Sequence, residues 1–198
     1  MRIVLVHGMN ASPQSGFWPW LGDALRARGH EVIVPELPNP AEPNCQEWVE
    51  AIDKSIHEPS GDTVFIAHSI GCAALLHYFE QADMSGTPKS TVLIAPPYHI
   101  GSEKFESFFN PPVDWDTVEW KSQGYVVIHS KDDDKIPFDH ALKYEQLLNA
   151  QLMAVEEGKH FTEVTELPLI LDLIDDRNVE PGDGLDDDFS DIDVVLGL

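Results

Sequence analysis

The chain has 198 residues, which suits one domain, and its hydrophobic content of 42% is sufficient for a globular core. Its formal net charge is −23, from 35 acidic and 12 basic residues. An acidic excess of this size repels the phosphates of nucleic acids and the surface of anionic membranes, so we expect neither as a partner. No apolar stretch approaches the roughly 20 residues that span a bilayer, and the start has no signal-peptide pattern. Cys45 and Cys72 have neither metal-binding nor disulfide-framework spacing, which fits a reducing compartment and predicts a cytoplasmic protein.

Strand-like and helix-like segments alternate along the chain. Short runs rich in β-branched residues predict strands, and they cover 2–7, 31–37, 62–68, 90–97, 124–130 and 151–157. Helical patterns cover 17–30, 45–58, 70–81, 138–149 and 162–175, the last interrupted by Pro168. This alternation predicts an α/β fold with a mostly parallel, doubly wound sheet and helices on both faces.

Two stretches do not fit the alternation. Residues 97–121 are irregular and rich in aromatic side chains; they either wall a pocket or simply cover the core. From Asp172 onward, ten acidic residues accompany the single base Arg177. We therefore divide the chain into an α/β domain at 1–175 and an acidic extension at 176–198. A run of like charge is typical of an interaction tail, but no motif in it supports a protein partner.

The joint between the strand at 62–68 and the helix at 70–81 reads "AHSIG". A serine on a tight strand-to-helix turn, between small residues, is typical of a nucleophile elbow. The small residues are needed because the strand and the helix almost touch at that turn. Ser69 is the serine of this motif, and its alternative role is that of an ordinary helix N-cap. Because ligands of such sheets bind at the carboxyl ends of the strands, we place the chemistry here.

A serine hydroxyl needs a base, and in this fold class the acid and then the histidine follow the serine in sequence. That order leaves His140 and His160, of which His160 follows the last strand in a glycine-containing loop and is favoured. The acid should follow the strand at 124–130, where Asp132, Asp133 and Asp134 are consecutive and spacing does not decide between them. An oxyanion hole requires two backbone N–H groups, and we assign these to Ile70 and Met9.

With these residues, the chain resembles the small serine hydrolases of the retinoblastoma-binding protein 9 / YdeN family, within the α/β-hydrolase superfamily. The resemblance covers about 1–174 and rests on "SGFWPWL", "PELPNP", "HSIG", "HSKDDDKIP" and "GKHF". In that family the acid lies four residues before a proline, which selects Asp133 here, four before Pro137. Two features depart from the family pattern: Ala67 replaces a commoner glycine, and Pro43 stands where a retinoblastoma-binding L-x-C-x-E motif needs leucine.

The resemblance implies a serine hydrolase that cleaves small ester or amide substrates through a Ser69–Asp133–His160 triad and an acyl-enzyme. We expect no cofactor and no metal. The residues expected to border the substrate pocket are Gly8, Asn10, Trp18 and His68, and the lack of a large inserted lid predicts an open pocket that favours small acyl groups. The alternative is a catalytically weak protein of the same fold that acts as a binding or interaction module.

Overall fold

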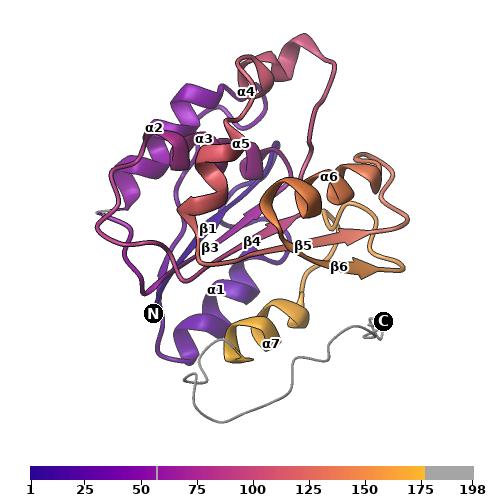
Figure 1. Ribbon diagram of the computed structural model, residues 1–198. Helices are drawn as coiled ribbons and strands as arrows, with labels where there is room; N and C mark the ends of the chain where they lie inside the picture. Colours follow the sequence, from indigo (N-terminus) through magenta and orange to yellow (C-terminus); the bar gives the residue numbers. More distant parts are fainter. Residues whose placement is uncertain (57, 177–198) are drawn as a thin grey trace.

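A computed structural model describes residues 1–56 and 58–176 of the chain, so the extension predicted at 176–198 lies almost entirely outside the described residues. Six strands, all parallel, form one sheet in the order β2-β1-β3-β4-β5-β6 (Figure 1). Their bounds are β1 (Arg2–Val6), β2 (Glu31–Ile33), β3 (Thr63–His68), β4 (Ser90–Ile94), β5 (Tyr125–Ser130) and β6 (Gln151–Val155). The predicted parallel sheet is confirmed.

Helices cover both faces of this sheet, as the doubly wound pattern predicts (Figure 1). One face is covered by α1 (Trp18–Ala27) and α7 (Pro168–Asp176). The other face is covered by α2 (Cys45–Ser55), α3 (Ile70–Gln81) and α6 (Asp139–Leu148). The irregular stretch after β4 adds α4 (Glu106–Phe109), α5 (Trp115–Val118) and two 3₁₀ turns, Glu103–Phe105 and Glu119–Lys121, on that second face.

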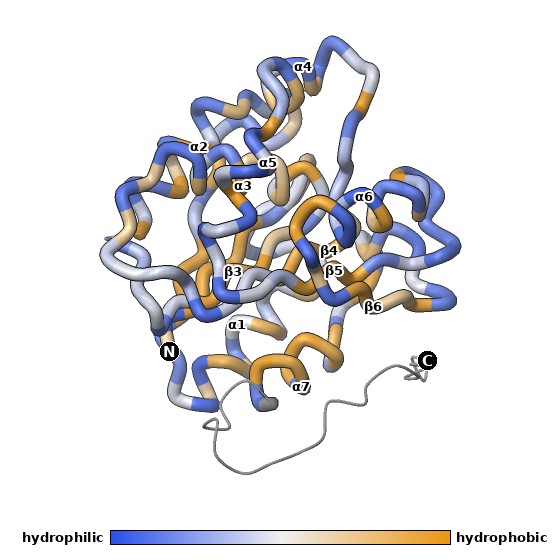
Figure 2. Tube along the Cα trace, in the orientation of Figure 1, coloured by the Kyte–Doolittle hydropathy of each residue, from blue (hydrophilic) through white to orange (hydrophobic). Residues whose placement is uncertain are grey.

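Each strand divides its side chains between the two faces, because successive residues of a strand point in opposite directions. In β1, Ile3 and Leu5 join the core under α1 and α7, whereas Val4 and Val6 join the core under α2 and α3. The sheet is therefore apolar on both sides, and the hydrophilic residues lie mainly on the outer faces of the helices and in the loops (Figure 2).

Most predicted elements are longer than those observed, and a proline explains the difference in two of them. The strand predicted at 31–37 ends at Ile33, since Pro35 has no N–H to donate to the sheet. The helix predicted at 162–175 begins at Pro168 instead of being interrupted there; proline is well tolerated in the first turn, where the N–H has no helical partner. Within the described residues, no helix is long and apolar enough to cross a membrane.

Candidate active site

Ser69 lies at the joint between β3 and α3 in a strained backbone conformation, with φ 53° and ψ −133°. A non-glycine residue reaches this region only when its surroundings hold it there. Its own N–H donates to the carbonyl of Ile94 at 2.9 Å, which fixes the turn to the end of β4. The Ser69 side chain makes no capping hydrogen bond to the helix, so it does not serve as the N-cap that the alternative required.

Two glycines allow the sharp turn at Ser69. A Cβ added to Gly71 would lie 2.3 Å from the backbone oxygen of His7, so only glycine lets α3 approach the end of β1 this closely. A Cβ added to Gly8 would lie 3.0 Å from the Ser69 Cβ. The small residues that the sequence indicated around the serine are thus required by the contact between β1, β3 and α3.

His160 is hydrogen-bonded to both Asp133 and Ser69, so the three predicted side chains form one continuous chain of hydrogen bonds. Its Nε2 accepts the Ser69 hydroxyl at 2.8 Å, and its Nδ1 donates to Asp133 Oδ2 at 2.8 Å. The imidazole is 4% exposed and follows β6 in a loop where Lys159 and Phe161 both have positive φ. The residues come from three different connections at the carboxyl edge of the sheet, where ligand sites of such folds lie.

Asp133 is the member of the aspartate run that reaches the imidazole. Its Oδ1 accepts the backbone N–H groups of Lys135 at 2.8 Å and Ile136 at 2.9 Å, and its side chain is fully buried. Burial alone raises the pKa of this carboxyl, but the hydrogen bonds from His160, Ile136 and Lys135 outweigh it and hold the pKa below its ordinary value. The group is therefore an anion at neutral pH, as a partner of a histidine N–H should be.

The neighbouring aspartates have other surroundings. Asp132 Oδ1 accepts the N–H groups of Gly158 at 2.9 Å and Lys159 at 2.8 Å, so Asp132 braces the loop that carries His160. Its hydrogen bond from Ser130 adds to these and lowers the pKa of the carboxyl. Asp134 is exposed and lies 3.9 Å from the Lys135 ammonium.

The two amides assigned to an oxyanion hole have no hydrogen-bond partner in the part of the chain that the structure describes. Ile70 is the first residue of α3, and the first N–H groups of a helix have no partner within it. Met9 follows Gly8 in the loop after β1, and the next residue, Asn10, donates its N–H to the carbonyl of Pro40 at 2.8 Å. Both amides are free to donate to a substrate oxygen.

The four residues expected to border the pocket lie in different surroundings in the structure. Gly8 lies against Ser69, and Asn10 is exposed in the same loop. Trp18 is 3% exposed in α1, in the core on the opposite face from α3, where its ring lies 4.5 Å from that of Phe17. Trp18 is therefore a core residue, because α1 covers the face of the sheet away from the cavity described below.

His68 also faces α1, and it supports the loop of the base instead of lining a pocket. Its Nε2 donates to the backbone carbonyl of His160 at 2.8 Å, and the two rings lie 5.0 Å apart. Burial, followed by the proximity of His160, lowers the pKa of His68 to about 3. A ring with so low a pKa stays neutral, so it adds no positive charge beside His160.

A second buried histidine, His129 in β5, lies beside the Asp133 carboxylate. It was not a candidate for the base because it precedes the acid in the sequence. Its Nδ1 donates to the carbonyl of Ser130 at 3.0 Å, and its Nε2 lies 3.9 Å from Asp133 Oδ2. Burial lowers the pKa of His129, so the neutral ring does not compete with His160 as an ion-pair partner of Asp133.

A cavity of about 130 Å³ lies on the α3 face of the sheet. None of the four residues expected to border a pocket lines it. Its walls come from α3, from α6 and from the aromatic stretch after β4, which was expected either to wall a pocket or to cover the core. Ala73 and Tyr144 carried no local signal, since each reads as an ordinary apolar position of its helix. In the described ranges, 1–56 and 58–176, no three His, Cys, Asp or Glu side chains are grouped so as to hold a metal ion.

The fold is that of an α/β hydrolase, and the comparisons with known proteins agree. The chain belongs to the serine hydrolase family, whose model matches residues 3–168. The YdeN protein of Bacillus subtilis (strain 168) is 28% identical over 183 residues, which cover 87% of this chain and 94% of YdeN. These matches confirm the family resemblance and the hydrolase class.

Solved structures give the same result for the fold. The crystal structure of the ydeN gene product from B. subtilis matches with a TM-score of 0.82 and 27% identity, over 89% of this chain and 97% of that one. Est1E from Butyrivibrio proteoclasticus matches with a TM-score of 0.66 over 89% of this chain and 87% of that one. At 11% identity, the second match concerns the fold alone.

Proposed function

We propose that the chain cleaves a carboxylic ester or amide by nucleophilic catalysis, with Ser69 as the nucleophile, His160 as the general base and Asp133 as the residue that orients His160. The main support for this proposal is the continuous chain of hydrogen bonds from Asp133 Oδ2 through both ring nitrogens of His160 to Ser69 Oγ. Both hydrogen bonds are 2.8 Å long. A base that holds both partners at this distance is set to take the hydroxyl proton as the serine attacks.

In the first half of the reaction, Ser69 Oγ attacks the carbonyl carbon while its proton moves to His160 Nε2. The N–H groups of Met9 and Ile70 stabilise the negative oxygen that forms. The C–O or C–N bond then breaks, the leaving alcohol or amine takes the proton from His160, and the acyl group remains on Ser69. In the second half, His160 removes a proton from water as the water oxygen attacks the acyl carbon. The bond between the acyl carbon and Ser69 Oγ then breaks, and His160 returns the proton to Ser69 Oγ, which releases the acid and restores the free serine. Asp133 stays ionised and stabilises the imidazolium in both halves.

Labelling with a fluorophosphonate probe, combined with hydrolysis of p-nitrophenyl acetate, tests this proposal. We expect the probe to label Ser69 in the native chain. We expect Ser69→Ala to abolish labelling and to lower the turnover rate by about 10⁴- to 10⁶-fold, because the residues of a triad act as a unit. Ser102→Ala is the matched control, since Ser102 is exposed and its hydroxyl has no hydrogen-bond partner among the described residues.

Two results would count against the proposal. Failure of the folded native chain to react with the probe would remove Ser69 as a nucleophile. Normal labelling with no turnover over a broad panel of esters and amides would instead favour the binding module that the sequence left as the alternative.

A further inference from the structure

The cavity on the α3 face is connected to Ser69 along two segments of chain. Ala73 in its wall follows Ser69 by four residues of α3, a rise of about 6 Å along the helix axis. Tyr98 in another wall follows Ile94 by four residues, and the Ile94 carbonyl holds the Ser69 N–H. One wall therefore lies close in the chain to Ser69, and the other lies close to Ile94, the hydrogen-bond partner of the Ser69 N–H.

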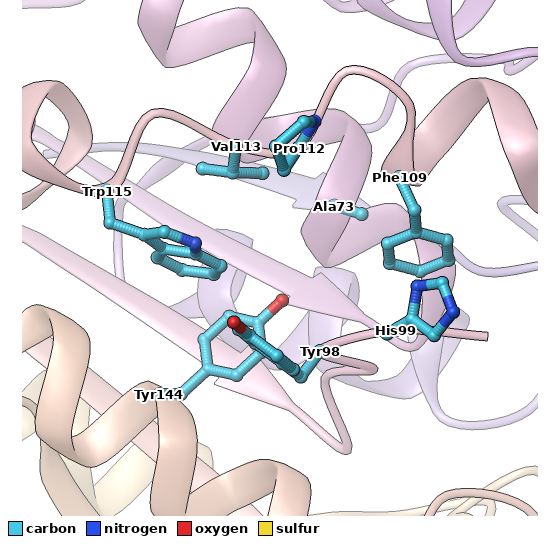
Figure 3. A pocket seen from close by; sticks show the side chains of 8 residues that line it. All are labelled: Ala73, Tyr98, His99, Phe109, Pro112, Val113, Trp115 and Tyr144. Atoms are coloured by element: carbon cyan, nitrogen blue, oxygen red, sulfur yellow. The ribbon is translucent and has the colours of Figure 1, made fainter. Parts of the chain in front are cut away.

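Aromatic rings supply most of the surface of this cavity (Figure 3). The ring of Trp115 stacks on Tyr98, with centroids 5.7 Å apart, and meets Tyr144 edge to face at 5.3 Å. On the other side, His99 contacts Phe109 at 5.5 Å. These rings come from α4, α5, α6 and the loop after β4, so the cavity is a built feature of the fold and its walls favour an apolar guest.

Among the residues that line the cavity, only Tyr98, His99, Trp115 and Tyr144 have polar atoms in their side chains. None of the lining residues is an acid, a lysine or an arginine. The Tyr144 hydroxyl is already used, because it donates to the carbonyl of Pro97 at 3.1 Å, and burial holds its pKa well above the ordinary value. A carboxylate would therefore find no lysine or arginine here to compensate for its lost hydration.

The volume limits the size of the guest. Pockets for drug-sized ligands enclose roughly 300–1,000 Å³, whereas an apolar cavity of about 150 Å³ accommodates benzene. A cavity of about 130 Å³ therefore has room for a short aliphatic chain or one phenyl ring.

The position of His160 indicates which part of the substrate the cavity binds. His160 must lie beside the leaving group in order to protonate it, and none of the lining residues comes from the loops that carry Asp133 or His160. The leaving group belongs on the side of those loops, and the acyl group belongs on the side of α3. We propose that the cavity binds the acyl group of the substrate and that this group is uncharged, apolar and no larger than about one phenyl ring. This proposal rests on the proposed function of Ser69.

Two opposite changes of the wall test the proposal in the full-length chain. Ala73→Val removes room next to α3, and Trp115→Ala adds room opposite. The matched control is Trp120→Ala, because Trp120 is in the same stretch of chain but is 77% exposed. The value of kcat/KM is measured for p-nitrophenyl esters from acetate to decanoate, for benzoate, and for a series of acetate esters that differ only in the alcohol.

For the native chain we expect an optimum at butanoate to hexanoate, activity on benzoate, and little dependence on the size of the alcohol. Ala73→Val should lower the hexanoate-to-acetate ratio by at least about 10-fold, since one methylene in an apolar pocket changes kcat/KM by about 10- to 200-fold. Trp115→Ala should move the optimum to longer chains, and Trp120→Ala should leave the profile unchanged.

The outcomes separate this inference from the proposed function. If the probe labels Ser69 but neither wall variant alters the acyl profile, the cavity is not the acyl site and the proposed function still stands. A profile that responds to the alcohol series instead would assign the cavity to the leaving group and overturn the inference. If Ser69 is not labelled, the proposed function itself fails. Trp115→Ala remains an independent test if Ala73→Val does not fold.

Discussion

Three consecutive aspartates after β5 have three different environments, although the sequence presents them as equivalent. Asp133 reaches His160, Asp132 holds the backbone of the loop that carries His160, and Asp134 is exposed. Which carboxylate meets the imidazole depends on the path of two loops, each set by backbone hydrogen bonds of its own. That is why spacing along the chain left the three open and only the family resemblance selected Asp133.

Amide variants of the three aspartates should therefore differ in effect. We expect Asp133→Asn to lower kcat by about 10⁴-fold, because an amide no longer orients the correct tautomer of His160 or stabilises its charge. Asp132→Asn should cause a smaller loss through the weaker bracing of Gly158 and Lys159, and Asp134→Asn should leave kcat unchanged. Steady-state kinetics with p-nitrophenyl acetate measure all three. A loss in Asp132→Asn as deep as that in Asp133→Asn would contradict the assignment.

The face of the sheet on which His68 and Trp18 lie could not be predicted from the sequence. Both lie near the serine or the first loop in sequence, which suggested a pocket. Whether a side chain reaches the pocket depends, however, on which face of the sheet it occupies. His68 ends β3 on the face of α1, and Trp18 belongs to α1 itself, so both are on the far side of the sheet from the cavity. The alternation along β3 holds this information, but only once the face of each helix is known.

At the scale of elements, the contact between α3 and the end of β1 positions Ser69 and the N–H of Ile70. α3 begins one residue after the serine, and Gly71 lies against the backbone of His7 in its first turn. The sequence predicted this joint well, since a buried strand, a serine and a slim helix are all local features.

A methyl group on Gly71 should therefore disturb both stability and activity. Gly71→Ala places a Cβ against backbone that does not yield, and we expect a loss of about 2 kcal/mol, or roughly 4–8 °C in melting temperature. The fall in kcat should be larger than this loss of stability alone explains, because α3 must move away from β1. Gly22→Ala in α1 is the matched control: its Cβ meets only the flexible end of Arg26, and alanine favours a helix. An unchanged melting temperature and activity in Gly71→Ala would refute the close-packing argument.

The cavity on the α3 face could not have been predicted in the same detail. The aromatic stretch at 97–121 indicated a wall, but the cavity also needs Ala73 from α3 and Tyr144 from α6, which meet only in the folded chain. Its volume is the space that the packed side chains leave unfilled, and no local pattern in the sequence encodes that space.

For the whole molecule, the described residues contain two apolar cores, one on each face of the sheet. Ile170 and Ile174 of α7 are fully buried against the face that α1 also covers. The excess of acid in the following residues adds charge to the chain, which opposes compaction more than it assists it. We therefore propose that the unit at 1–175 is stable without the residues that follow it.

A chain truncated after Asp176 should fold, melt cooperatively within a few degrees of the full chain, and react equally with the fluorophosphonate probe. A chain truncated after Leu167 should not fold, because it loses five buried apolar residues of α7: Leu169, Ile170, Leu171, Leu173 and Ile174. Each such residue stabilises a fold by about 1.5–3 kcal/mol, and the net stability of a domain is only about 5–15 kcal/mol. Differential scanning calorimetry and probe labelling compare the three chains. A large fall in melting temperature or labelling on removal of 177–198 alone would assign those residues a part in the fold or the site, and the proposed boundary would be wrong.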